Sequence, residues 1–191
     1  VYAVDIATKV IKQLTQGDWH AWEFDVSADG KRLAVVGADN PFEWSWYQTR
    51  ISVVDIETAK ETMMHQSQRQ LARPLFSPDN HTIAFLSSTW SDRGVTSGDL
   101  YVVPWGNGEA RNLTQGYEGS ISWMVWNENG HQLLAVSTEG TDCVLSEIDL
   151  LSGRMKRLWA GAIGVANSSQ PTFSYSSVRS SFALVRESPT E

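Results

Sequence analysis

The sequence predicts an all-β protein made of repeated units, and three observations support that prediction. The string Leu-Thr-Gln-Gly occurs at residues 14–17 and again at residues 113–116, and an apolar run of matching pattern lies between them at residues 51–56. These spacings correspond to a repeat of roughly 50 residues, a period typical of propellers and solenoids. Gly, Asn, Asp and Ser interrupt the chain often, and no long stretch keeps the apolar spacing of a helix.

A tight hairpin turn is predicted to join the first two strands of each unit. The turns read Ser-Ala-Asp-Gly, Ser-Pro-Asp-Asn and Asn-Glu-Asn-Gly, with a weaker fourth copy, Ser-Tyr-Ser-Ser. Asp-Gly, Asp-Asn and Asn-Gly tolerate the positive φ that such turns need. An apolar run follows each turn and predicts a strand buried on both faces. The turns lie at residues 27–30, 77–80, 127–130 and 174–177, and the runs at residues 32–36, 82–86, 132–136 and 181–185.

A third and a fourth strand complete each unit. The third is apolar and leads into a short turn, whereas the fourth has the mixed polarity of an outer edge strand that must not pair with a neighbour. Four antiparallel strands per period, with the polar strand outermost, are the sequence form of a β-propeller blade. The third strands are predicted at residues 1–6, 51–56, 100–105 and 145–150, and the fourth at residues 10–15, 61–65, 110–114 and 155–159.

About four blade equivalents are predicted, in one propeller region. The boundaries are residues 1–17 for a half blade, 18–66, 67–116 and 117–161 for complete blades, and 162–191 for a second half blade. The two halves are complementary and could close a ring of four blades. The sequence favours a fragment of a larger propeller instead, because residues 187–191 stop where a third strand should begin. Open blade edges invite pairing, so we expect dimerisation or end-to-end closure.

Charge and composition exclude several classes of partner. The formal net charge is −7, and the 15 Lys and Arg residues form no basic stripe, which argues against nucleic acid and anionic membranes. No apolar run approaches the ~18 residues that a membrane-spanning helix needs. Cys143 is the single cysteine, so no intrachain disulfide can form and a cytoplasmic location is favoured. A periplasmic or secreted location stays open, since the chain begins inside a strand and a signal peptide could precede it.

No catalytic constellation is visible in the chain. The nucleophile elbow Gly-x-Ser-x-Gly is absent, and the nearest serine, Ser120, lacks the second glycine. The four histidines have neither the helical nor the strand spacing that would direct two imidazoles at one metal, so neither a metal nor another cofactor is expected. His81 and His131 directly follow hairpin turns and are expected to face solvent.

Three acidic residues are predicted to be structural. Asp29, Asp79 and Glu128 lie in the hairpin turns. A carboxylate at such a position can accept a hydrogen bond from the backbone two residues further on.

Tryptophan is abundant, with nine residues in the chain, and three of them fall in first-strand segments. Large rings there are expected to fill the space between neighbouring blades. These three are Trp22, Trp123 and Trp126.

Two long inserts, at residues 38–49 and 88–98, form the predicted functional surface. Each joins a second to a third strand, exceeds the usual hairpin length and lies on the rim opposite the short turns. Exposed aromatic and Arg side chains on long loops favour a binding role. The alternative is that the rings tuck under their own loops. The residues predicted to contact a peptide or a neighbouring domain are Glu43, Trp44, Trp46, Tyr47, Trp90 and Arg93.

The repeat resembles that of a known family. Residues 76–85, Phe-Ser-Pro-Asp-Asn-His-Thr-Ile-Ala-Phe, together with residues 99–104 and 109–114, look like the WD-like propeller repeat of the prolyl oligopeptidase family and of the periplasmic protein TolB. Residues 181–190 are similar to the last propeller blade of dipeptidyl aminopeptidases and acylaminoacyl peptidases, which favours the peptidases over TolB. In that family an α/β-hydrolase domain carries a Ser-His-Asp triad, and the propeller caps it and restricts substrates to short peptides.

The resemblance implies that this chain is the propeller cap of a serine oligopeptidase or aminopeptidase. The whole protein would be a hydrolase, whereas this part, without nucleophile or triad, would be inert alone. Its expected partners are a C-terminal α/β-hydrolase domain and short peptides. One alternative is a free-standing TolB-like propeller that binds other proteins. Another is a metal-dependent propeller enzyme that acts on a sugar polymer, which only the tryptophan content supports.

Overall fold

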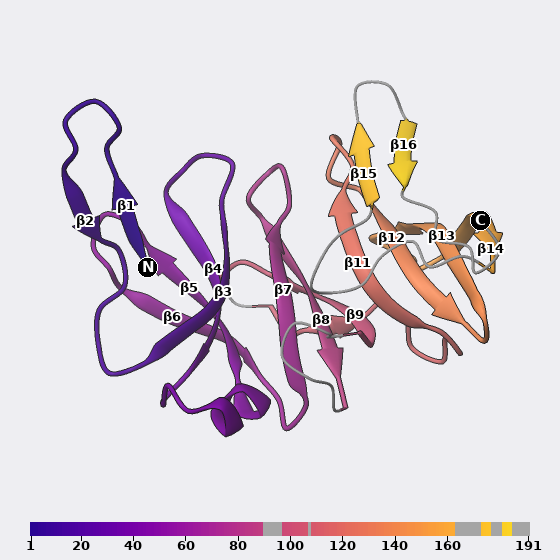
Figure 1. Cartoon of the computed structure of the whole chain (residues 1–191), viewed down its shortest axis with the longest axis horizontal. Coiled ribbons are helices and arrows are strands. Elements are labelled where there is room, and N and C mark those ends of the chain that lie inside the picture. The colour runs from indigo at the N-terminus through magenta and orange to yellow at the C-terminus, as the bar shows by residue number, and fades with distance from the viewer. Residues whose placement is uncertain (90–96, 107, 163–172, 177–180, 185–191) are drawn as a thin grey trace, which may run out of the picture. The chain divides into compact units, whose positions relative to one another are not determined.

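The structure, a computed structural model, describes residues 1–89, 97–106, 108–162, 173–176 and 181–184. These residues form sixteen β-strands and one short 3₁₀ helix, η1 (Glu43–Gln48) (Figure 1). The strands are β1 (Tyr2–Val4), β2 (Ile11–Gln13), β3 (His20–Val26), β4 (Arg32–Ala38), β5 (Arg50–Asp55), β6 (Glu61–Gln66), β7 (Gln70–Phe76), β8 (Thr82–Ser88), β9 (Asp99–Pro104), β10 (Arg111–Asn112), β11 (Ser120–Trp126), β12 (Gln132–Glu139), β13 (Asp142–Asp149), β14 (Met155–Gly161), β15 (Phe173–Ser176) and β16 (Ser181–Leu184).

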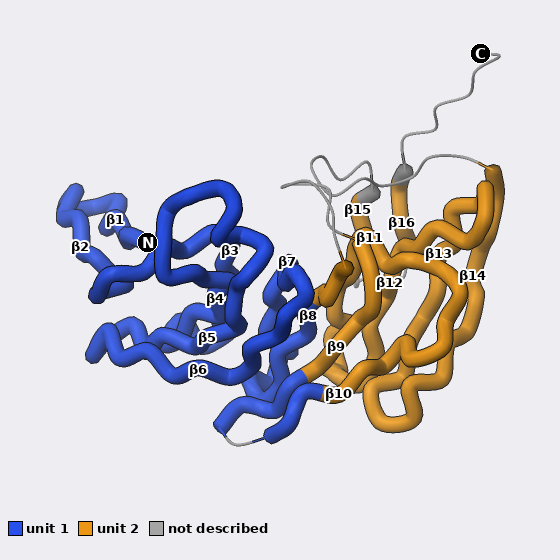
Figure 2. The backbone as a smooth tube through the Cα atoms, turned by 90° about the horizontal axis from the view of Figure 1, so that it is seen from below, with its two compact units in different colours: residues 1–85, 103–110 blue, residues 86–102, 111–191 orange. Residues whose placement is uncertain are grey.

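Consecutive strands pair with one another in every sheet. Blade 1 has the strand order β3-β4-β5-β6, blade 2 the order β10-β9-β8-β7 and blade 3 the order β11-β12-β13-β14, while β1-β2 and β15-β16 form an N-terminal and a C-terminal hairpin. The four-stranded antiparallel sheets confirm the predicted all-β fold of propeller blades. The chain divides into two compact units, residues 1–85 with 103–110 and residues 86–102 with 111–191 (Figure 2).

The hairpin turn of blade 1 forms as its sequence predicts. Ser27 Oγ donates a hydrogen bond to Asp29 Oδ1 (2.6 Å) and accepts one from the backbone N–H of Arg32 (2.9 Å). The N–H of Lys31 donates to the same Asp29 oxygen (3.1 Å). Gly30 has a φ of 69°, which a residue without Cβ adopts at little cost. Side-chain bonds and backbone conformation therefore specify the same turn.

The hairpin turns of blades 2 and 3 repeat this arrangement with different residues. In blade 2 the carboxylate of Asp79 accepts the N–H of His81 (3.0 Å). In blade 3 it is Asn129 that accepts the N–H of His131 (2.8 Å). Asn129 takes the place of the aspartate in this turn, and its amide oxygen accepts the same hydrogen bond.

A second turn type recurs between the third and fourth strands. In blade 1 the Asp55 carboxylate accepts both the N–H and the hydroxyl of Thr58 (2.8 Å each), and Ala59 follows with a φ of 57°. The N-terminal hairpin and blade 3 build the same turn on Asp5 and Asp149. The donated hydrogen bonds lower the pKa of all three aspartates.

Within each blade the two short turns meet at one rim. The backbone N–H of Ile56 donates to the carbonyl of Lys31 in blade 1 (2.9 Å), and that of Leu150 donates to the carbonyl of His131 in blade 3 (2.9 Å). Blade 2 contains the equivalent bond. The strand directions predict this shared rim, and they leave the first insert at the other end of its blade.

The second strand of each complete blade forms the centre of the core. Strands β4, β8 and β12 are buried over most of their length, which agrees with the apolar runs that follow the hairpin turns. Trp126 is buried, and Trp22 and Trp123 are half-buried. One apolar cluster in blade 1 contains Leu33, Val35 and Val54 with Leu14. Another in blade 3 contains Leu134, Val136, Cys143 and Leu145, against which Trp123, Trp159 and Tyr175 pack.

Candidate functional site

The first insert folds around one buried tryptophan. Trp46, on η1, is 1% exposed. Ser45 is also buried, and its hydroxyl lies within hydrogen-bond distance of the carbonyls of Asn40 (2.5 Å) and Phe42 (2.6 Å). The backbone N–H of Ser45 donates to the Phe42 carbonyl as well (2.9 Å). These bonds fix the start of η1, so part of the insert does tuck under itself.

The same insert presents two aromatic rings to solvent. Phe42 and Trp44 are 58% and 57% exposed, and their rings stack with centroids 6.2 Å apart and an angle of 13° between the planes. Glu43, between them in sequence, is exposed too. A pair of large rings held in one orientation outside the core is typical of binding surfaces rather than of folding.

Arg50 anchors the base of the insert, a role that sequence reasoning missed. Its guanidinium bonds Asp39 (2.6 Å) and Glu61 (2.9 Å) and lies over the ring of Trp19, 5.6 Å from the ring centroid. Burial opposes the positive charge, but the two carboxylates together raise the pKa of Arg50 above its usual value. The sequence contained a signal for this role, because Arg50 directly precedes a predicted third strand. Its two partners are an acid of the insert, Asp39, and an acid of the fourth strand, Glu61.

The predicted contact residues divide into three groups. Trp44 and Glu43 point outward on η1. Trp46 belongs to the core of the insert, and half-buried Tyr47 contacts it with ring centroids 5.6 Å apart. The remaining two predicted residues, Trp90 and Arg93, lie outside the described residues.

The serine and histidine residues considered as candidates for chemistry lie in strands and turns of the blades. Ser120 is the first residue of β11, inside a sheet, and His81 and His131 are exposed, as predicted. His65, on β6, is half-buried against the ring of Phe85, 5.2 Å away, and burial lowers its pKa. Within the described ranges no three His, Cys, Asp or Glu side chains are grouped to hold a metal ion.

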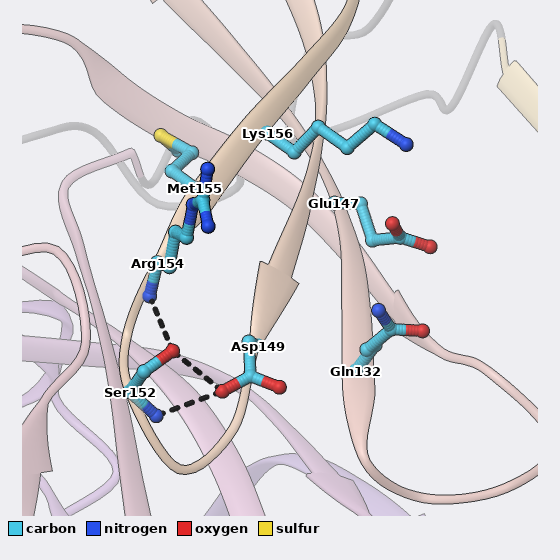
Figure 3. A pocket seen from close by; sticks show the side chains of 7 residues that line it. All are labelled: Gln132, Glu147, Asp149, Ser152, Arg154, Met155 and Lys156. Carbon is cyan, nitrogen blue, oxygen red and sulfur yellow. Dashed lines mark hydrogen bonds between the residues drawn. The ribbon is translucent and has the colours of Figure 1, made fainter.

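A second candidate site is a pocket of about 650 Å³ on blade 3 (Figure 3). Asp149 is bonded to Ser152 within its own turn, and the dashed lines in Figure 3 show these bonds. Glu147 and Lys156 lie opposite each other on β13 and β14, and Gln132 lies opposite Asp149 on β12. The pocket is lined by Gln132, Glu147, Asp149, Ser152, Arg154, Met155 and Lys156.

Register places most of the pocket on one face of the blade 3 sheet. Leu134 and Leu145 alternate with their neighbours onto the same face as Gln132, Glu147 and Lys156. We call this the forward face, and the equivalent face of blade 1 carries Val53. In blade 3 the forward face is apolar near β11, where Tyr175 packs, and polar near the short-turn rim.

Tyr117 forms a polar network that the sequence did not reveal. Its hydroxyl lies 2.6 Å from Ser137 Oγ and donates to Glu139 Oε1 (2.5 Å), and Glu139 also pairs with Arg157. Burial, together with the bond to Glu139, raises the pKa of Tyr117 to about 12. A phenol with that pKa stays protonated at neutral pH, so the network ties the link between blades to β12 rather than supplying a base.

Comparison with known sequences identifies a peptidase as a relative. The uncharacterized peptidase YuxL of Bacillus subtilis is 30% identical over 112 residues, which cover 59% of this chain and 16% of that protein. The chain thus spans about a sixth of the length of the curated relative that it matches. No protein-family model matches the chain.

Comparison with solved structures identifies the fold. An oligogalacturonate lyase in complex with manganese has a TM-score of 0.72 at 16% identity, over 96% of this chain and 58% of that one. Puromycin hydrolase has a TM-score of 0.69 at 14% identity, over 88% of this chain and 29% of that one. TolB from Acinetobacter baumannii has a TM-score of 0.59 at 22% identity, over 82% of this chain and 37% of that one. At these identities the likeness shows the fold alone.

Sequence and fold agree on the repeat. The relative in sequence is a peptidase, and the structural neighbours include an acylaminoacyl peptidase of Pyrococcus horikoshii and TolB, which represent the two groups whose repeat the sequence resembles. In the described part of the chain no helix is long and apolar enough to cross a membrane. The chain is therefore a stretch of β-propeller that is similar in sequence to a peptidase and in fold to the propellers of peptidases and of TolB.

Proposed function

We propose that this chain is the non-catalytic propeller cap of a serine oligopeptidase or aminopeptidase. The observation that carries the proposal is a contrast within the sequence. The chain matches a peptidase at 30% identity, yet it contains no Gly-x-Ser-x-Gly in which a nucleophile could stand. The chemistry would then belong to an α/β-hydrolase domain of the same protein, and the propeller would limit access to it.

The surface proposed to contact that domain is the aromatic pair of the first insert. Phe42 and Trp44 are exposed and stacked, and buried Trp46 and the Arg50 ion pairs hold their loop in place. Because the loop is already ordered, little conformational entropy is lost when the rings are covered. Rigid aromatic anchors of this kind supply much of the free energy of protein association.

The experiment uses the full-length gene product that contains this chain. A fluorophosphonate probe should label one serine in it, and the protein should hydrolyse short peptide esters faster than unfolded protein. The double variant Phe42→Ala, Trp44→Ala should lose that size preference, with about a tenfold change in the ratio of the two rates. The matched control is Leu151→Ala, which removes an 85% exposed apolar side chain from a blade 3 turn and should change nothing. A full-length protein that the probe does not label contradicts the proposal.

A second candidate function is protein binding by a free-standing TolB-like propeller. The structural match to TolB, at the highest identity of the three structures compared above, favours it. The reading frame after residue 191 separates the two candidates. A Gly-x-Ser-x-Gly followed by α/β sequence supports the cap, and a stop codon supports the free-standing binder. The cytoplasmic location stays a prediction in both cases.

A further inference from the structure

One arginine of blade 1 is held between an indole ring and two carboxylates. The guanidinium of Arg50 lies over the ring of Trp19, 5.6 Å from the ring centroid. It also pairs with Asp39 (2.6 Å) and Glu61 (2.9 Å). A guanidinium is planar and has five N–H donors, so one side chain can stack on a ring and donate to an acid at the same time. Arg50 makes both kinds of contact.

Arg32, at the start of β4, repeats this combination with different partners. Its guanidinium lies over the ring of Trp105, 5.2 Å from the ring centroid. The carboxylate of Asp29 is 3.6 Å from the same guanidinium. In both cases a tryptophan and a carboxylate surround one arginine side chain. A tryptophan with an acid beside it is therefore a place where this chain binds a guanidinium.

The exposed part of the first insert offers the same two groups without the cation. Phe42 and Trp44 are 58% and 57% exposed and stack on each other, and Glu43, between them in sequence, is exposed as well. We call these three residues the insert tip. Over the residues that the structure describes, no Lys or Arg side chain lies over either ring or pairs with Glu43.

The charge around the insert tip favours a cation from elsewhere. Arg50 is the only basic residue between positions 38 and 50, and Asp39 and Glu61 already engage it. With Glu43, three carboxylates thus stand against one guanidinium. Excess negative charge attracts a basic surface and repels an acidic one. The face of an aromatic ring adds to that preference, because its π-system attracts cations.

We propose that the insert tip receives an arginine side chain from the protein surface that covers it. The incoming guanidinium stacks on Trp44, since tryptophan is the ring that binds cations best, and it donates to Glu43. Arginine is favoured over lysine, because an ammonium cannot stack on a ring and bond a carboxylate through two parallel N–H groups. The inference rests on the proposed contact role of this surface, and under the cap function the arginine belongs to the α/β-hydrolase domain.

A peptide titration of the chain 1–191 tests the chemistry. The probe is the tripeptide N-acetyl-Leu-Arg-Leu-amide, and its citrulline isostere keeps the shape but lacks the charge. The NMR signals of the backbone amides of residues 42–48 report binding. The arginine peptide should bind about tenfold more tightly than the citrulline peptide. Glu43→Gln should remove most of that difference, and Trp44→Ala should abolish binding. Equal affinity for the two peptides, or no binding of either, overturns the proposal.

Two further variants identify the source of any effect. Glu57→Gln removes an exposed acid from a blade 1 turn, and it is the matched control for Glu43→Gln and should bind like wild type. Arg93→Gln tests a cation of the second insert, which lies outside the described residues. It should also bind like wild type. Tighter binding in Arg93→Gln would make the chain's own Arg93 the occupant and would overturn the proposal.

The full-length gene product distinguishes a partner surface from a free peptide. Where the partner already covers the insert tip, the arginine peptide should bind at least about tenfold more weakly than it binds the chain 1–191. Equal binding would leave the tip open to peptides and would overturn the proposal. The cap function fails separately. A full-length protein that the fluorophosphonate probe leaves unlabelled contradicts the cap alone, whereas a labelled protein whose 1–191 chain does not distinguish the two peptides contradicts this inference alone.

Discussion

Blades 1 and 3 share a fold and a register, but their forward faces differ in chemistry. In blade 1 that face carries Ala34, Val36, Ile51 and Val53, each no more than 1% exposed, and β7 packs against β4 and β5. In blade 3 the position of Val53 is Glu147, and a polar pocket lies beside the apolar cluster of the same face. The backbone repeat therefore does not decide what a blade binds. The side chains of one face decide whether that face is core or binding surface.

Exchanging Val53 and Glu147 between the two blades should produce the largest difference in stability. Val53→Glu places a carboxylate at a position that is 1% exposed, and the burial of that charge should cost about 3 kcal/mol of unfolding free energy. Glu147→Val should stay within about 0.5 kcal/mol of wild type, because its site is open. Urea unfolding of both variants measures the difference. Equal losses would show that the blade 3 face is packed like that of blade 1.

The first insert allows the same comparison between a buried and an exposed side chain, Trp46 and Trp44. Trp46→Ala should lower the unfolding free energy by about 3–4 kcal/mol, since it removes a buried ring and leaves a cavity. Trp44→Ala should cost less than about 1 kcal/mol, because that ring is 57% exposed. Thermal melts of the two variants provide the measurement. Similar losses would mean that Trp44 belongs to the core and is no contact residue.

Sequence reasoning predicted the strands and turns of the blades, but not which side chains of the first insert are buried. The hairpin turns at Asp29 and Asp79 were predictable because side-chain bonds within a few residues determine them. The separation of Trp46 from Trp44 was not, because both occur in one aromatic run and only three-dimensional packing assigns one to the core. Two hydrogen bonds to main-chain carbonyls were also missed, from Lys12 to Ile56 and from Arg111 to Leu150. A donor and a main-chain acceptor far apart in sequence leave no pattern until the register is known.

The third-to-fourth turns offer a smaller test at a matched position. Gly153 has a φ of 68°, and a Cβ there would lie 3.1 Å from the Leu113 carbonyl oxygen, so Gly153→Ala should cost about 1–2 kcal/mol. Ala59 holds the same position in blade 1 with a φ of 57°, so Ala59→Gly should gain up to about 1 kcal/mol. Urea unfolding measures both changes. A loss in each variant would contradict the equivalence of the two turns.

The smallest expected effect is a pH dependence of the melting temperature that comes from His65. Burial against Phe85 lowers the pKa of His65, so the folded state binds a proton less readily than the unfolded state. The stability that this difference contributes is fully present above the unfolded pKa and is lost as the pH falls through the lower, folded pKa. The melting temperature should therefore fall between about pH 7.5 and about pH 5.5 in wild type and fall less in His65→Gln. His131→Gln, at an exposed turn, is the control and should keep the wild-type slope, whereas an unchanged slope in His65→Gln would assign the dependence to other groups.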